Sequence, residues 1–183
     1  MSEPVSEPMQ ALYAGERDRA EELLAAHGDP DIFEAAAFGR IERLRTLLDA
    51  DAGLAGALSP DGFTALHFAA FFGQPGCAEL LLERGADPSR RAQNPMTVEP
   101  LHSAAAANQT EIARMLLDAG ADPNAVQEGG FVPLHSAAAN GNAELTELLL
   151  ERGADTAAAT NDGRTAAQLA RESGHTGLAD SLA

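Results

Sequence analysis

A chain of 183 residues is long enough to bury a core of its own, and its 28 acidic against 12 basic residues give a formal net charge of −16 at pH 7. This charge repels a phosphate backbone and speaks against nucleic-acid binding, and the single cysteine excludes an intrachain disulfide and suits a reducing compartment. Because no apolar run approaches the ~20 residues of a membrane-spanning helix and the start, MSEPVSEPMQ, lacks the features of a secretory signal, we expect a cytoplasmic protein that binds no membrane.

The N-terminal third of the chain is predicted to hold a tail followed by two pairs of helices. Residues 1–8 are acidic and contain proline, and we expect a flexible tail there. One helix pair is predicted within residues 9–28, around Gly15, and a second within residues 29–58, around Gly39. The step between these glycines is 24 residues, which is too short to include a normal hairpin loop.

Residues 59–93 show the pattern of one unit most clearly. In TALHFAAFFG, an apolar helical face is formed by Leu66, Ala69 and Ala70 at positions i, i+3 and i+4. Gly73 ends this helix, because glycine readily adopts positive φ. A second helix follows over CAELLLER, and the polar stretch ADPSRRAQNP leads into the next pair. The unit is therefore predicted to run helix, turn, helix, loop.

The same pattern returns in residues 94–126, 127–159 and 160–183, and two markers give its period. Leucine–histidine pairs are spaced by 35 and 33 residues, with a glutamine a further 33 along, at His67, His102, His135 and Gln168. The glycines that end the second helices repeat with the same spacings, at Gly85, Gly120 and Gly153. Two independent markers with one period predict an array of repeated units.

These units resemble the ankyrin repeat. The likeness rests on TALHFAAFFGQ, EPLHSAAAANQ and VPLHSAAANGN in the first helix, and on LLERGADPS, LLDAGADPN and LLERGADTA at the end of the second. The resemblance implies one all-α solenoid over residues 9–183, with about six helix-turn-helix units, short hairpin-like loops and atypical capping units at both ends. It also implies a non-enzymatic protein that binds a partner protein, and we expect a monomer.

The three histidines could belong to a chemical site or to the scaffold. A zinc site needs ligands that converge to bonds of about 2.0–2.1 Å, whereas equivalent residues of packed helices lie ~8–10 Å apart. The favoured interpretation, which the resemblance also implies, is that each imidazole bonds near its helix start and ties one unit to the next loop. The common catalytic motifs are absent from the sequence. We therefore predict no enzyme activity, no cofactor and no metal, and we interpret Cys77 as a buried structural thiol.

The ankyrin resemblance implies that a partner binds the concave side, which is formed by loop tips and the outer surface of the first helices. Six aromatic residues map to that side, and aromatic anchors are common at binding hot spots. The 87–99 loop, two residues longer than the next, adds two arginines and a methionine. The candidate partner-binding residues are Phe71, Phe72, Phe63, Phe131, Phe38, Tyr13, Arg90, Arg91 and Met96, with Phe71 and Phe72 favoured.

Two alternatives stay open at this point. The large residues before each helix start could simply pack between neighbouring loops, and the longer loop could be a tolerated surface insertion. The charge also allows a different function, that of an acidic inhibitor or immunity-type protein that neutralises a basic toxin or enzyme through charge complementarity. Finally, Thr64 can cap its helix, whereas Val132 cannot, so Val132→Thr is predicted to stabilise the array.

Overall fold

The computed structural model describes residues 5–183, and over this range it contains twelve α-helices and no strand beyond one isolated bridge between Ala159 and Thr165. The helices form six consecutive pairs. Their bounds are α1 Glu7–Tyr13, α2 Arg17–His27, α3 Ile32–Ala37, α4 Ile41–Ala50, α5 Ala65–Phe71, α6 Pro75–Glu83, α7 Pro100–Ala106, α8 Thr110–Asp118, α9 Pro133–Ala139, α10 Ala143–Glu151, α11 Ala166–Glu172 and α12 Thr176–Ser181.

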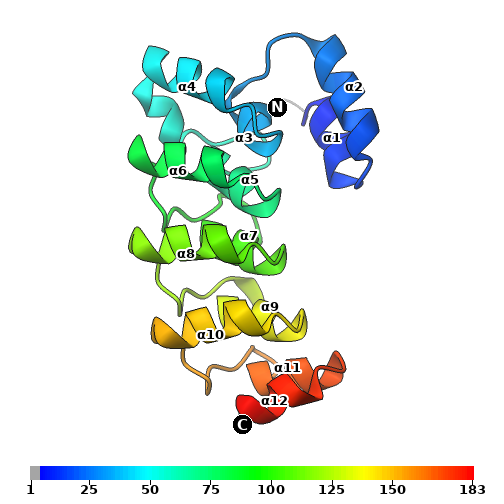
Figure 1. The fold of residues 1–183 in the computed structure, drawn as a ribbon, viewed down its shortest axis with the longest axis vertical. Coiled ribbons are helices and arrows are strands. Elements are labelled where there is room, and N and C mark those ends of the chain that lie inside the picture. Colours follow the sequence, from blue (N-terminus) through cyan, green and yellow to red (C-terminus); the bar gives the residue numbers. More distant parts are fainter. Residues whose placement is uncertain (1–4) are drawn as a thin grey trace.

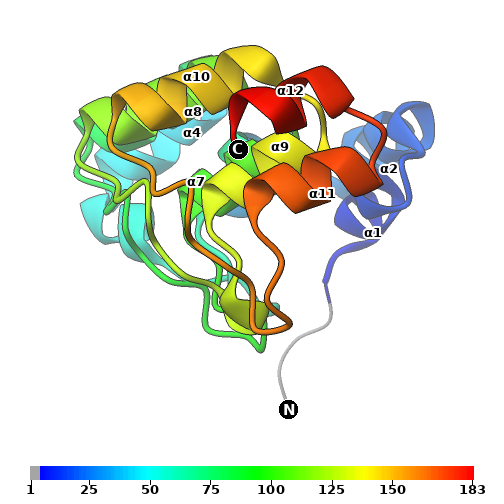
Figure 2. The same cartoon turned by 90° about the horizontal axis from the view of Figure 1, so that it is seen from below.

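The second to sixth pairs are stacked along the long axis of the molecule. The first helices α3, α5, α7, α9 and α11 form an inner row, and α4, α6, α8 and α10 form an outer row beside it (Figure 1). Seen along the stack, the connecting loops extend from the helices to one side (Figure 2). The concave face is the surface where the loops and the inner row of helices meet at an angle. The prediction of an all-α solenoid is confirmed.

The core of the stack consists of leucines and alanines that repeat with the period of the sequence. Leu66, Leu101 and Leu134 are fully buried at equivalent positions of the inner helices. Each is followed three and four residues later by buried alanines, such as Ala69 and Ala70. The small alanine side chains let neighbouring inner helices approach closely, so that each unit buries its apolar face only against its neighbours.

The tight turn inside each unit explains one recurrent glycine. Gly73 has a φ of 69°, and a Cβ atom added there would lie 2.8 Å from the Gln109 side chain of the next unit. Unit four has Asn108 at the equivalent position, with a φ of 60°, because asparagine tolerates the left-handed conformation better than most residues. The turn geometry is thus kept where the glycine is lost.

The first helix pair departs from the predicted arrangement. The α1–α2 pair does not continue the stack but lies beside the inner row, next to α3 and α5 (Figures 1 and 2). Tyr13 contacts α5, with its ring centroid 5.9 Å from that of Phe72, and its hydroxyl donates to Asp61 at 2.6 Å. The missing hairpin loop before Gly39 explains the difference, because without it the pair lacks the element that aligns the other units.

The expected boundary of the N-terminal tail also needs a correction. Helix α1 begins at Glu7, with Ser6 before its first residue, so that two residues assigned to the tail of residues 1–8 are helical. Pro8 is compatible with this, because the first turn of a helix leaves its N–H groups without intrahelical partners. The prediction for residues 1–4 lies outside the described range.

Candidate functional site

The histidines form a ladder that joins successive units. In each, Nδ1 accepts from the backbone N–H at the start of its own helix, and Nε2 lies within hydrogen-bond distance of a carbonyl oxygen in the next loop. The Nε2–oxygen distances are 3.1 Å for His67 with Val98, 2.9 Å for His102 with Ala125 and 3.1 Å for His135 with Ala158. Because Nδ1 accepts, Nε2 carries the proton and donates it to the carbonyl. The scaffold interpretation is confirmed.

Burial keeps these imidazoles neutral. Desolvation lowers the pKa of His67 and of His102 to about 4, and it also lowers the pKa of His135. Gln168 replaces the ring in the last unit, and its Oε1 accepts from the Thr165 N–H at 2.8 Å. Both ring nitrogens of each histidine are therefore committed to the scaffold.

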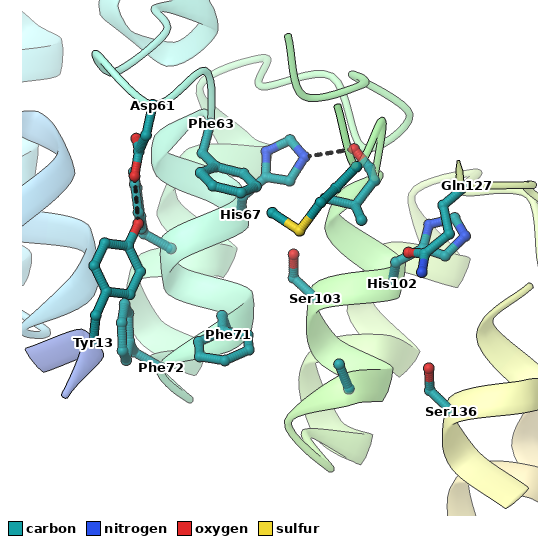
Figure 3. A pocket seen from close by; sticks show the side chains of 14 residues that line it. Tyr13, Asp61, Phe63, His67, Phe71, Phe72, His102, Ser103, Gln127 and Ser136 are labelled. Carbon is teal, nitrogen blue, oxygen red and sulfur yellow. Dashed lines mark hydrogen bonds between the residues drawn. The ribbon is translucent and has the colours of Figure 1, made fainter. Parts of the chain in front are cut away.

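A groove lies on the concave face beside this ladder (Figure 3). Its volume is about 470 Å³, and its walls come from α1, the inner helices α5, α7 and α9, and the loops before them. One end is aromatic, and the floor is formed by small residues of the next two units, Ser103, Ala106 and Ser136. Met96 and Gln127 of the loops line the remaining side.

The aromatic end of the groove is held together by edge-to-face and tilted contacts between rings. Phe71 and Phe72 meet with their ring centroids 5.2 Å apart and an interplanar angle of 87°, and Phe63 lies 5.6 Å from the His67 ring. Phe71 is 44% exposed and Tyr13 is 45% exposed, although both are large apolar rings. The groove therefore presents a fixed and partly uncovered aromatic cluster to solvent.

The comparison with protein families supplies the identity of the fold. A family model described as ankyrin repeats (3 copies) matches residues 9–92, 32–127 and 101–183, which together span most of the chain. The chain belongs to the ankyrin-repeat family. Ankyrin repeats are generally protein–protein interaction modules. A comparison with curated proteins found no match.

The ankyrin array brings together five of the nine predicted partner-binding residues. Tyr13, Phe63, Phe71, Phe72 and Met96 all line the groove. The structure also adds residues that the search for aromatics missed, namely Asp61 and the small floor residues. The repeat register could have identified the floor, because Ser103 and Ser136 occupy the same position in successive units.

The burial of Phe38 contradicts its predicted role in partner binding. This side chain is only 3% exposed and belongs to the apolar core, so that it cannot contact a partner in this conformation. The first helix pair lies close by, since Glu21 of α2 pairs with Arg40 of the α3–α4 turn, two residues beyond Phe38. Phe72, the equivalent residue of the next unit, is only half-buried.

The other three candidates lie outside the groove. Phe131 is half-buried and packs against His135, with ring centroids 5.7 Å apart, as the packing alternative expects. Arg91 pairs with the buried carboxylate of Glu99, with 3.2 Å between Nε and Oε1. Arg90 is exposed on the same loop. The array therefore uses Phe131 and Arg91 for its own packing.

The described residues include no metal-binding cluster, no exposed thiol and no membrane-spanning helix. Over residues 5–183, no group of three or more histidine, cysteine or acidic side chains is placed to hold a metal ion. Cys77 is buried and burial raises its pKa to about 11, so that its thiol is protonated and inert near neutral pH. In the same range, no helix is long and apolar enough to cross a bilayer.

Proposed function

We propose that this ankyrin-repeat protein is a non-enzymatic interaction module that binds a segment of a partner protein in the concave groove, as a monomer in the cytoplasm. The observation that carries the proposal is the partly exposed aromatic cluster of Phe71, Phe72 and Tyr13 at one end of the groove. Aromatic side chains in a pocket are typical anchors of protein interfaces. A cavity of about 470 Å³ accommodates one or two large apolar side chains.

The test compares capture of binding proteins by the wild type and by Phe71→Ala/Phe72→Ala. We expect the double variant to lose the proteins that the wild type retains. The matched control is Val126→Ala, because Val126 is 48% exposed and lies outside the groove. Equal retention of the same proteins by the wild type and the double variant would show that the groove is not the binding surface.

The unpaired acidic charge of the surface supports a second candidate function, that of an acidic inhibitor of a basic toxin or enzyme. All twelve basic residues are arginines, and all but Arg17 and Arg90 lie within 4.0 Å of a carboxylate. Most of the excess acidic charge is therefore left without a cationic partner among the described residues. Such a surface attracts a basic toxin or enzyme and accelerates its association.

The salt dependence of binding distinguishes the two functions. For an inhibitor steered by charge, the association rate is expected to fall at least about tenfold when the ionic strength rises from about 0.05 M to about 0.5 M, since the Debye length then shortens well below 10 Å. A rate that is insensitive to salt, together with a strong effect of Phe71→Ala/Phe72→Ala on the dissociation rate, would favour the apolar groove alone.

A further inference from the structure

The α1–α2 pair lies where a partner would bind. We call residues 5–27 the N-terminal hairpin. One face of α1 meets the array, because Ser6, Met9 and Tyr13 follow the spacing of three and four residues that places side chains on one side of a helix. Tyr13 contacts Phe68 of α5 and Phe72, the residue that follows α5, with ring centroids 6.4 and 5.9 Å apart. The hairpin therefore covers part of the inner row that other units leave open.

The seam between hairpin and array is bordered by open clefts. A second cavity, of about 760 Å³ and open to solvent, is lined by the N-terminal end of α1 and by residues of the array. Asp61 and Phe68 line both cavities, so that the hairpin meets the array along a contact with open space on each side. Solvent therefore reaches this contact from two open clefts, whereas the apolar faces of stacked units are buried between their neighbours.

One ion pair, between Glu21 and Arg40, joins the hairpin to the array, but the polar contacts of α1 are weaker than the site allows. Two carboxylates of the array accept from neutral hydroxyls of the hairpin, Asp61 from Tyr13 and Glu34 from Ser6, each at 2.6 Å. In the described part of the chain, no arginine pairs with either carboxylate. A cationic donor forms a stronger hydrogen bond with a carboxylate than a hydroxyl does.

The hairpin is itself poorly matched in charge to the surface that it covers. It carries more acidic than basic side chains, namely Glu7, Glu16, Asp18, Glu21 and Glu22 against Arg17 and Arg19. It lies on an array whose own charge is negative. Apart from the pair of Glu21 with Arg40, the hairpin gains little attraction from this surface, whereas a cationic segment at the same place would be attracted to Glu34 and Asp61.

The connection to α3 permits the hairpin to move as a unit. Gly28, which follows α2, has a φ of 112° and no atom within 4 Å of the position of an added Cβ. It is therefore a residue of wide conformational freedom in an open place, between the hairpin and the Arg43 Nε hydrogen bond to the Pro30 carbonyl that fixes the start of the array.

We propose that the N-terminal hairpin occupies in cis the docking site of a helical segment of the partner, and that binding displaces it. The segment is amphipathic and basic: its apolar face takes the place of Tyr13 on Phe68 and Phe72, and its Lys or Arg side chains pair with Glu34 and Asp61. This inference rests on the proposed function, and it adds the chemistry of the partner and the segment that competes with it.

The direct test measures hydrogen exchange of the full chain with a 14-residue leucine–lysine amphipathic helical peptide as the probe. A leucine–glutamate peptide of the same pattern is the charge control. We expect the leucine–lysine peptide to accelerate exchange of the amides in residues 7–27 several-fold while α7 to α10 keep their protection. Peptide binding with an unchanged hairpin, or exchange that rises equally in all helices, would overturn the proposal.

Two conservative variants test whether a cationic side chain of the partner replaces the Tyr13 hydroxyl beside Asp61. Tyr13→Phe removes only the hydroxyl that bonds to Asp61, so we expect it to bind the leucine–lysine peptide about 2- to 10-fold more tightly, in line with the loss of one competing hydrogen bond. Asp61→Asn removes the cation partner and is expected to weaken binding. Thr46→Val is the control, since its hydroxyl bonds to the Glu42 carbonyl on α4. Weaker binding by Tyr13→Phe contradicts the proposal.

The same peptide separates failure of this inference from failure of the proposed function. If Phe71→Ala/Phe72→Ala weakens peptide binding but residues 7–27 stay protected, the groove binds as proposed and the hairpin is a fixed part of it. If the peptide binds neither the wild type nor Tyr13→Phe, the displacement proposal is wrong. The capture experiment with whole proteins then decides on the groove independently.

Discussion

At the scale of single residues, the buried histidines make the stability of the array depend on pH. In the folded chain, burial lowers the pKa of His67 and His102 to about 4, below the ~6.5 of an exposed ring. Because the pKa is lower in the folded chain, protons bind the unfolded chain first as the pH falls. The stability that the neutral histidines contribute is therefore complete above about pH 6.5 and is lost as the pH falls toward 4. We expect the free energy of unfolding, measured with urea, to fall over this window.

Carboxylates titrate at the lower end of the same window, so a matched variant isolates the histidine effect. His102→Gln copies Gln168, whose Oε1 accepts from the backbone N–H at the start of its helix. This variant should keep that hydrogen bond and show a shallower loss of stability between pH 6.5 and pH 4.5. Identical pH dependence in the wild type and the variant would mean that the imidazole of His102 does not contribute.

A hydroxyl at position 132 is predicted to stabilise the fifth unit. Thr64 Oγ1 lies 2.8 Å from His67 Nδ1, whereas the equivalent Val132 is 4% exposed and places a methyl group near His135. Valine and threonine have nearly the same shape, so Val132→Thr should add the polar contact without repacking. We expect the free energy of unfolding to rise by about 0.5–2 kcal/mol. An unchanged or lower thermal midpoint would refute this.

The sequence predicts the contacts of the histidines, but it does not predict the different burial of Phe38 and Phe72. The spacing of 33 to 35 residues predicts the role of the histidines, because a role repeated in every unit follows from position within the unit. The same register places Phe38 and Phe72 at equivalent positions, yet one is buried and the other lines the groove. Position within the unit does not predict this difference. The contacts of the first helix pair are equally hard to predict, because they join residues as far apart as Tyr13 and Asp61, and no local pattern encodes them.

At the scale of elements, ion pairs between successive outer helices form a ladder with a missing step. Arg84 pairs with Asp49 of the preceding unit at 2.6 Å, and Arg152 pairs with Asp118 at 2.8 Å. Unit four has Ala119 at the equivalent position, opposite Glu83. We expect Ala119→Arg to complete the ladder and to raise stability by about 0.2–1 kcal/mol, as is typical of exposed pairs.

Thermal unfolding of two variants, compared with the wild type, checks this prediction. The midpoint should rise in Ala119→Arg, and most of the gain should disappear in the double variant Ala119→Arg/Glu83→Gln. High salt should reduce the gain, because both side chains are near the surface. A gain of equal size in the single and the double variant would show that helix propensity, and not the pair with Glu83, is responsible.

The elements themselves are well predicted from the sequence, whereas the placement of one pair is not. Gly73 and its equivalents, together with Pro100 and Pro133 at helix starts, mark the helix ends through local backbone chemistry. The position of α1–α2 depends on the absence of a loop and on contacts across the concave face. Sequence alone predicts an atypical end unit there, but it does not predict that the unit folds against the groove.

At the scale of the whole molecule, the stack is a rigid frame that exposes one apolar groove within a strongly acidic surface. Each unit buries its leucines and alanines against its neighbours. The histidine ladder and several arginines, such as Arg84 and Arg152, hold successive units together. The groove and its aromatic end are the part of the concave face that this scaffold leaves available for a partner.

The most direct test of this account is a hydrogen-exchange footprint of the full chain bound to the protein that it captures. We expect protection around Phe71 and Phe72 of α5, around Ser103 of α7 and in the loop that carries Met96, with the outer helices α6, α8 and α10 unchanged. Protection of the outer helices with no change along the groove would contradict the central claim that the concave groove is the binding surface.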